Sequence, residues 1–186
     1  MNLQFNEKKA AQAAAILLRL RGGPMSYMKL IKLLYLADRK SLLTRGRPIT
    51  ADQFFSMDHG PVLSRVLNLI TGDERPGTEP IWRTCISKPQ NYEVDLINDP
   101  GDEELTFAEE QTLREVFAEF GNWDRWDLVE YVHTLPEWED PKGGAKPIHY
   151  ETIMKIGGIS DDEIESISQD QNSEVELDKI LSKYAA

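Results

Sequence analysis

The sequence predicts an α+β fold that is mainly α, in which a helical domain carries a small antiparallel β-sheet of about three strands. Two observations predict this class. Apolar residues recur at spacings of three and four along several long segments, which is typical of amphipathic helices. Alternation of apolar and polar residues, the strand pattern, is confined to short stretches.

Two helices are expected in the first quarter of the chain. The first covers residues 6–21 and stops at Gly22-Gly23-Pro24. The second has Ser26 as its expected N-cap and ends at Gly46. Because apolar side chains occupy much of its surface, the second helix should lie near the centre of the core; its main stripe is Leu30, Leu33, Leu34 and Ala37.

The middle of the chain supplies the expected sheet. Residues 52–58 alternate as a strand, and a short helix is expected over residues 62–70. A loop at residues 72–80 follows. We expect residues 81–97 to form a hairpin that pairs with the 53–57 strand.

The later chain is again helical. Capping boxes predict helix starts at Thr106, Ser160 and Ser173, because each is followed three residues later by glutamate. Asp124 is expected to cap a further helix that ends by Pro136, and a loop containing Trp138 leads to a short helix at residues 149–156.

Composition limits the classes of protein. A chain of 186 residues with 40% hydrophobic residues suits one globular domain, or one domain with a short appendage. No apolar run approaches the roughly 20 residues that span a bilayer. Cys85 is the only cysteine, so no internal disulfide can form. We expect a soluble protein in the cytoplasm, with no membrane partner.

Charge is unevenly distributed along the chain. Residues 1–50 contain ten lysines and arginines and two acids, whereas the whole chain has a net charge of −11. This polarity could steer a partner, or opposite charges could interleave on the folded surface. A basic face could also bind nucleic acid, but the second helix is too apolar to lie open in a groove, and overall acidity opposes non-specific binding.

The sequence Asp58-His59-Gly60-Pro61 joins the expected strand to the expected helix. Gly60 permits unusual backbone angles, and Pro61 suits a first helical turn. A catalytic histidine would need a nucleophile and an orienting acid, but Asp58 should point to the opposite face. Chain turning or a partner surface is favoured, while an anion at the helix start stays open.

Metal and phosphate sites are not expected. The three histidines, His59, His133 and His149, include no pair at metal-ligand spacing, and Cys85 has no second cysteine nearby. The glycine-containing loops lack the P-loop pattern. We therefore expect no cofactor, no metal and no catalytic residue.

Two stretches resemble a known family. Residues 28–70, MKLIKLLYLADRKSLLTRGRPITADQFFSMDHGPVLSRVLNLI, resemble the N-terminal signature of the SocA-like Panacea domain family of phage-associated proteins and bacterial antitoxins. The matching parts are Lys32 to Tyr35, Gly46 to Ile49 and His59 to Val62. Residues 128–144, LVEYVHTLPEWEDPKGG, resemble the family's later helix and tryptophan-containing loop. The similarity spans residues 5–157.

The resemblance implies a binding protein and not an enzyme. Its partner would be a cognate toxin, and a stand-alone member could act as a proteolytic adaptor to a Clp-type protease. Residues 1–157 would form the antitoxin domain and residues 158–186 an acidic helical extension. The oligomeric state stays open. The expected partner-binding residues are Lys32, Tyr35, Asp58, His59, Gly60, Pro61, Arg65 and Trp138.

Two other functions stay open beside toxin neutralisation. A DNA-binding regulator of a toxin–antitoxin or phage operon predicts DNA affinity that falls steeply with salt. A small-molecule or anion-binding enzyme predicts a deep pocket that contains His59 and a second titratable residue.

Overall fold

The computed structural model describes residues 3–73 and 81–184, apart from the side chains at 174 and 178–184. Over these residues the chain forms eight α-helices and two small antiparallel sheets, so the mainly α, α+β prediction is confirmed. Most of the predicted loop at 72–80 lies outside the described residues.

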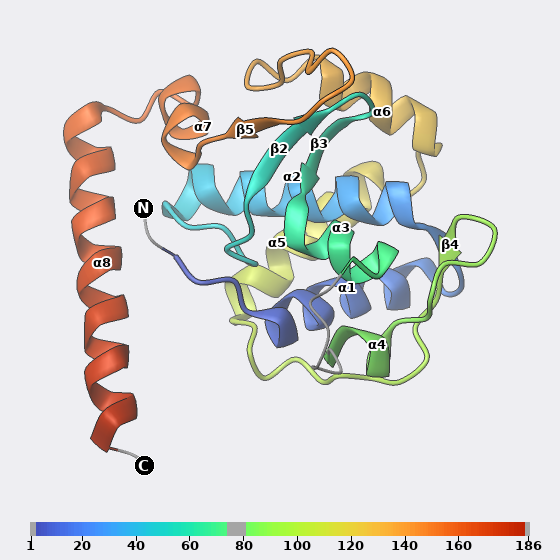
Figure 1. Cartoon of the computed structure of the whole chain (residues 1–186), viewed down its shortest axis with the longest axis horizontal. Helices are drawn as coiled ribbons and strands as arrows, with labels where there is room; N and C mark the ends of the chain where they lie inside the picture. Colours follow the sequence, from blue (N-terminus) through green and yellow to red (C-terminus); the bar gives the residue numbers. More distant parts are fainter. Residues whose placement is uncertain (1–2, 74–80, 185–186) are drawn as a thin grey trace.

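Helices α1 (Glu7–Arg21) and α2 (Tyr27–Arg45) begin and end where the sequence predicts. Both are followed by a glycine in the left-handed region, Gly22 at φ +74° and Gly46 at φ +72°. Helix α2 is buried around most of its circumference and crosses the middle of the molecule, with α1 on one side and a sheet on the other (Figure 1). Its predicted central position is therefore confirmed.

The three-stranded sheet has the order β3-β2-β5. Strand β2 (Phe54–Met57) pairs antiparallel with β3 (Gly60–Leu63) and with β5 (Lys146–Ile148). As its alternation predicts, β2 buries Phe54 and Ser56 and leaves Phe55 and Met57 half-buried. A second sheet has two short strands, β1 (Met25–Ser26) and β4 (Glu93–Val94).

The predicted hairpin over residues 81–97 is wrong in its first arm and in its partner. Residues Ile81–Cys85 form helix α4, and β4 pairs with β1 instead of β2. One helical turn buries both Trp82 and Cys85, which are three residues apart, and the Trp82 N–H donates to Glu7 Oε1 at 2.9 Å. Instead of residues 81–97, strand β5 pairs with β2, although the sequence predicts a loop there.

Helix α3 (Ser64–Thr71) starts later than predicted because Val62 and Leu63 belong to β3. Its first N–H groups are capped from a distance: the Asp52 carboxylate accepts from the N–H groups of Arg65 and Val66, each at 2.9 Å. Tertiary structure thus provides the cap that the local sequence lacks.

Helices α5 (Phe107–Phe120) and α6 (Arg125–His133) confirm their predicted starts. Thr106 and Glu109 form the capping box of α5, and Asp124 accepts from the Trp126 N–H at the start of α6. Helix α6 ends at His133, before Pro136.

The chain ends with α7 (Tyr150–Ile156) and α8 (Asp161–Tyr184). Ser160 and Glu163 form the predicted capping box. The cap predicted at Ser173 is wrong, because α8 continues through it and the Ser173 hydroxyl donates to the Gln169 carbonyl one turn earlier. Helix α8 stands at one end of the molecule (Figure 1), where it buries Ile164 and where Gln171 Nε2 donates to the Gly46 carbonyl at 2.7 Å.

Basic residues from the first 50 positions pair with acids from the middle of the sequence in the folded chain. Lys8 pairs with Glu103, Lys9 with Glu109, Arg19 with Asp99 and Lys40 with Glu115. Of the two readings of the charge pattern, interleaving is the one that these ion pairs support. They also occupy much of the basic surface that a nucleic-acid interface would need.

Candidate partner-binding surface

The Asp58-His59 segment is the turn of the β2–β3 hairpin, and the tip of this hairpin lies beside α6 (Figure 1). Gly60 has φ +89°, and a Cβ there would lie 2.5 Å from Val132 Cγ2, so both backbone angle and space require glycine. Pro61 lies on β3 opposite Ser56, so the expectation that it begins a helix is wrong. Strand β3 lies at the edge of the sheet, where a proline is tolerated because its missing N–H can face away from the neighbouring strand.

Lys32 links α2 to the hairpin by a hydrogen bond. Its side chain is buried, with 1% exposed, and Nζ donates to the Pro61 carbonyl at 2.8 Å. Burial lowers the pKa of Lys32 to about 7. The neighbouring His133 has a pKa lowered by burial and by the charge of Lys32, and its Nε2 has no hydrogen-bond partner within the described chain.

Tyr35 belongs to a separate buried network further along α2. Glu137, just after α6, accepts from the Tyr35 hydroxyl at 2.8 Å and from Arg39 Nε at 2.6 Å and Nη2 at 3.2 Å. Burial raises the pKa of Tyr35, and the charge of Glu137 raises it further. These groups satisfy one another, so this network joins α2 to the segment after α6.

The remaining predicted residues lie in two places. Asp58 Oδ1 accepts from the Gly143 N–H at 3.1 Å, and the exposed His59 meets the Trp126 ring edge-on, with centroids 5.8 Å apart. Trp138 Nε1 donates to the Met57 carbonyl at 3.2 Å. Arg65 is exposed on α3, where its guanidinium lies over the Phe5 ring. The structure therefore gathers Lys32, the hairpin and Trp138, and leaves Arg65 apart from them.

An apolar pocket of about 300 Å³ opens beside the hairpin. It includes His59, Asp58 and Lys32, as the enzyme hypothesis requires, but these groups make separate hydrogen bonds and contacts and do not converge on one point. Its walls are mainly apolar and come from α2, β2, β3 and α3: Tyr27, Met28, Ile31, Met57, Val62 and Leu67.

Three exposed aromatic residues lie near this pocket without lining it. Trp126 has 48% of its surface exposed, Trp123 38% and Tyr92 69%. Tyr92 packs against Tyr27 with ring centroids 6.2 Å apart, which links β4 to the start of α2. We call the following set the aromatic surface: Tyr27, Met28, Met57, His59, Tyr92, Trp123 and Trp126.

Sequence reasoning found His59 but missed the three most exposed aromatic residues of this surface. Trp126 lies off the apolar stripe of α6, formed by Leu128, Val129 and Val132, and this offset is the signal that could have revealed it. Tyr92 and Trp123 come from a turn and from the link between α5 and α6, so only the fold brings them beside α2.

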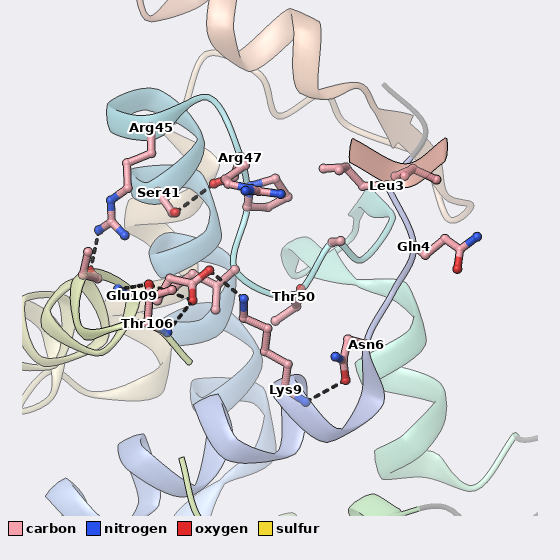
Figure 2. Close-up of a pocket in the computed structure, with 15 residues that line it drawn as sticks. Leu3, Gln4, Asn6, Lys9, Ser41, Arg45, Arg47, Thr50, Thr106 and Glu109 are labelled. Carbon is pink, nitrogen blue, oxygen red and sulfur yellow. Dashed lines mark hydrogen bonds and ion pairs between the residues drawn. The ribbon is translucent and has the colours of Figure 1, made fainter. Parts of the chain in front are cut away.

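A larger cavity of about 560 Å³ lies at the other end of α2 (Figure 2). Its polar side chains already pair with one another. Lys9 Nζ donates to Glu109 Oε1 at 2.8 Å, Asn6 Oδ1 accepts from the Lys9 N–H, and the Ser41 hydroxyl donates to the Arg47 carbonyl. The Lys9–Glu109 contact joins α1 to α5, and Arg45 joins α2 to α5 by donating to the Ala108 carbonyl and the Thr112 hydroxyl. These contacts leave few groups for a ligand.

Neither a metal centre nor a membrane span is found in the described part of the chain. No three of its histidine, cysteine, aspartate and glutamate side chains are placed to hold a metal ion. None of its helices combines the length and apolar character that crossing a bilayer requires.

Comparison with protein families gives one match. The family model described as antitoxin SocA-like, Panacea domain, matches residues 30–139, more than half of the chain. The protein belongs to the SocA-like Panacea domain family. No curated protein and no solved structure matches the chain.

The Panacea match runs from α2 to Glu139, just after α6, and contains all eight predicted partner-binding residues. Membership of an antitoxin-like family implies, in general terms, a toxin-type protein partner and an antitoxin-type role. The suspected family resemblance is therefore confirmed.

Proposed function

We propose that this Panacea protein neutralises a cognate toxin by binding it directly through the aromatic surface. The observation that carries the proposal is a set of exposed tryptophan and tyrosine side chains near an apolar pocket that half-buried methionines line. Aromatic residues and methionine are enriched at protein interfaces, and tryptophan and tyrosine dominate binding hot spots. Membership of an antitoxin-like family supports a toxin-type protein as the partner.

The pocket beside His59 gives this surface an anchor point. Its volume of about 300 Å³ suits one or two apolar side chains of a partner. Met28 and Met57 line it, and the flexible methionine side chain adapts to partners of different shape. Gly143 and Gly144 form part of the lining without adding side chains that would narrow it.

The predicted residues that are buried hold the β2–β3 hairpin and α2 in position beneath the aromatic surface. Lys32 holds Pro61 against α2, Gly60 allows close approach to Val132, and Trp138 holds the Met57 carbonyl. Tyr35 joins α2 to Glu137. In this proposal only Asp58 and His59 of the gathered residues are exposed enough to touch the toxin directly.

In the same proposal, residues 1–157 form the antitoxin domain and residues 158–186 an acidic helical extension. The extension contacts the domain through the buried Ile164 and through the hydrogen bond from Gln171 to the Gly46 carbonyl. Neither residue belongs to the aromatic surface.

The test is co-expression with the product of the adjacent gene. The wild-type protein should restore growth of cells that express a toxic neighbour, and the two proteins should co-purify. Trp126→Ala should weaken binding about tenfold or more, because a truncated hot-spot tryptophan commonly costs at least 1–2 kcal/mol. Phe107→Ala is the matched control, since Phe107 is 82% exposed on α5 and lies outside the aromatic surface.

Two results would contradict the proposal: no neighbouring product that is toxic and binds, or equal binding by both variants. The toxin half-life then separates two modes of action. A half-life shortened only in cells with an active Clp-type protease indicates a proteolytic adaptor. Growth rescue at an unchanged half-life indicates neutralisation by binding alone.

A further inference from the structure

A further cavity, of about 420 Å³, lies between the N-terminal ends of α2 and α6. Three cationic residues from three helices line it: Arg21 at the end of α1, Lys29 in α2 and Arg125 in α6. Trp123 and Trp126 complete the wall and belong to the aromatic surface as well. The cavity therefore joins the proposed toxin-binding face directly.

The three cations lack acidic partners. Lys29 is 7% exposed, and its Nζ donates only to two neutral carbonyls, Gly121 O at 2.6 Å and Trp123 O at 2.7 Å. The Arg125 guanidinium lies over the Trp126 ring. Across residues 3–73 and 81–184, no carboxylate forms an ion pair with any of the three, whereas Lys9, Arg39 and Lys40 are all paired.

Arg21 and Lys29 are close enough to affect each other electrostatically. Burial lowers the pKa of Lys29 and the charge of Arg21 lowers it further, while the charge of Asp124 offsets part of this decrease. Two like charges held near each other at one cavity repel, and an anion bound beside both would reduce this repulsion.

The start of α2 adds one unpaired donor, the Ser26 hydroxyl, to the same cavity. Ser26 is the N-cap residue, but its hydroxyl makes no capping hydrogen bond. Its Oγ is buried and has no partner among the residues that the structure describes. The N-terminal end of a 19-residue helix is electropositive, and the Ser26 hydroxyl can donate to an acceptor placed there.

Two acids also line the cavity and leave it positive. Asp124 Oδ1 accepts from the Trp126 N–H at 2.8 Å as the cap of α6, and its charge also acts on Lys29. Glu93 is exposed on β4, where water screens its charge. Three cations and the end of α2 therefore outweigh these two carboxylates.

We infer that this cavity binds a carboxylate side chain of the toxin, so that an acidic segment of the toxin docks beside Trp123 and Trp126. The inference rests on the proposed toxin-neutralising function. Charge complementarity selects the occupant: the cavity provides unpaired cations, and an aspartate or glutamate next to an apolar anchor would fill both it and the adjoining aromatic surface.

The experiment measures the affinity of the full-length protein for the adjacent gene's product by calorimetry at low salt. Arg21→Gln and Arg125→Gln should each weaken binding about tenfold or more. Lys40→Gln is the matched control, because Lys40 is a partly exposed cation on α2 that pairs with Glu115 outside the cavity, and it should bind within twofold of wild type. Circular dichroism should show that all three variants fold.

A second arm uses inorganic phosphate as a probe, followed by amide chemical shifts of Ser26, Met28 and Lys29. Saturable shifts that disappear in Arg125→Gln, together with competition between phosphate and the toxin, support the inference. Phosphate binding that leaves toxin affinity unchanged overturns it and assigns the cavity to a free anion.

The outcomes separate the two proposals. If the wild-type protein binds the toxin and the two arginine variants bind equally well, this inference fails and the proposed function stands. If the wild-type protein binds no neighbouring product, both fail.

Discussion

The buried charged groups in the two halves of α2 have different hydrogen-bond partners. In the second half, Asp38 accepts from the N–H groups of Ile49 and Thr50 and from the Thr50 hydroxyl. Arg39 pairs there with Glu137. In the first half, Lys29 and Lys32 hydrogen-bond only to neutral backbone carbonyls.

In our proposal, this difference separates a structural region from a binding region. Where charges are fully paired, as around Glu137, the groups join distant segments and leave nothing for a partner. Where the cations meet only carbonyls, their charge is not neutralised, and both the aromatic surface and the two adjoining cavities lie there. The proposal therefore places the partner at the end of α2 where the buried lysines have no carboxylate acceptor.

The largest expected loss of stability follows from breaking the paired half. Glu137→Ala removes a fully buried carboxylate and leaves Arg39 and the Tyr35 hydroxyl without their acceptor. We expect the free energy of unfolding to fall by about 3–5 kcal/mol, measured by urea denaturation. The control is Lys40→Ala, which breaks a more exposed ion pair on the same helix and should cost less than about 1 kcal/mol. Equal losses would remove the distinction between the two pairs.

A smaller loss is expected at Asp38. At pH 5 Asp38 is protonated in the folded chain, so Asp38→Asn keeps the shape and most of the hydrogen bonds. The variant adds a second amide N–H that has no partner in this buried site, and we expect a loss of about 1–3 kcal/mol at pH 5. Burial raises the pKa of Asp38 to about 7. The folded chain therefore holds a proton between about pH 4 and 7 that the unfolded chain releases, and this contribution to stability falls as pH rises through that window. The difference between wild type and variant should shrink from pH 5 to 7.5, and a constant or growing difference would contradict it.

The smallest effect at neutral pH is expected at Lys32, with the opposite pH dependence. Lys32→Met should change stability by less than about 1 kcal/mol near pH 7, because an apolar side chain replaces a buried cation. The pKa of about 7 in the folded chain means that, above it, the unfolded chain binds a proton that the folded chain does not. Wild-type stability relative to Lys32→Met should then rise by up to about 1.4 kcal/mol per pH unit between pH 7 and 9. Urea denaturation at pH 7, 8 and 9 measures this slope, and a flat difference would show that Lys32 stays charged.

Helix ends were predictable because their signals are local. Thr106 and Glu109 cap α5 through bonds three residues apart, and Gly46 ends α2 through its own backbone angle. The failures came where non-local contacts decided. No local pattern in residues 81–86 predicts the helical turn that packs Trp82 against α1. Likewise, no local pattern predicts that β2 pairs with residues 146–148.

The candidate surface divides in the same way. The turn at Asp58-His59 could be read from Gly60 and Pro61, although its form, a hairpin within the sheet, could not. Trp126 needed the fold, because its role depends on His59, which lies 67 positions earlier. The pairing of Tyr35 with Glu137 joins residues 102 positions apart.

By itself the sequence determined the helix-rich class, most helix boundaries and the Panacea resemblance, since these follow from side-chain periodicity and from hydrogen bonds that span only a few residues. Only the tertiary structure decided which strands pair, which charges are neutralised and which aromatic residues stay exposed. Burial and charge pairing depend on groups that are brought together from distant parts of the chain, so no local pattern encodes them.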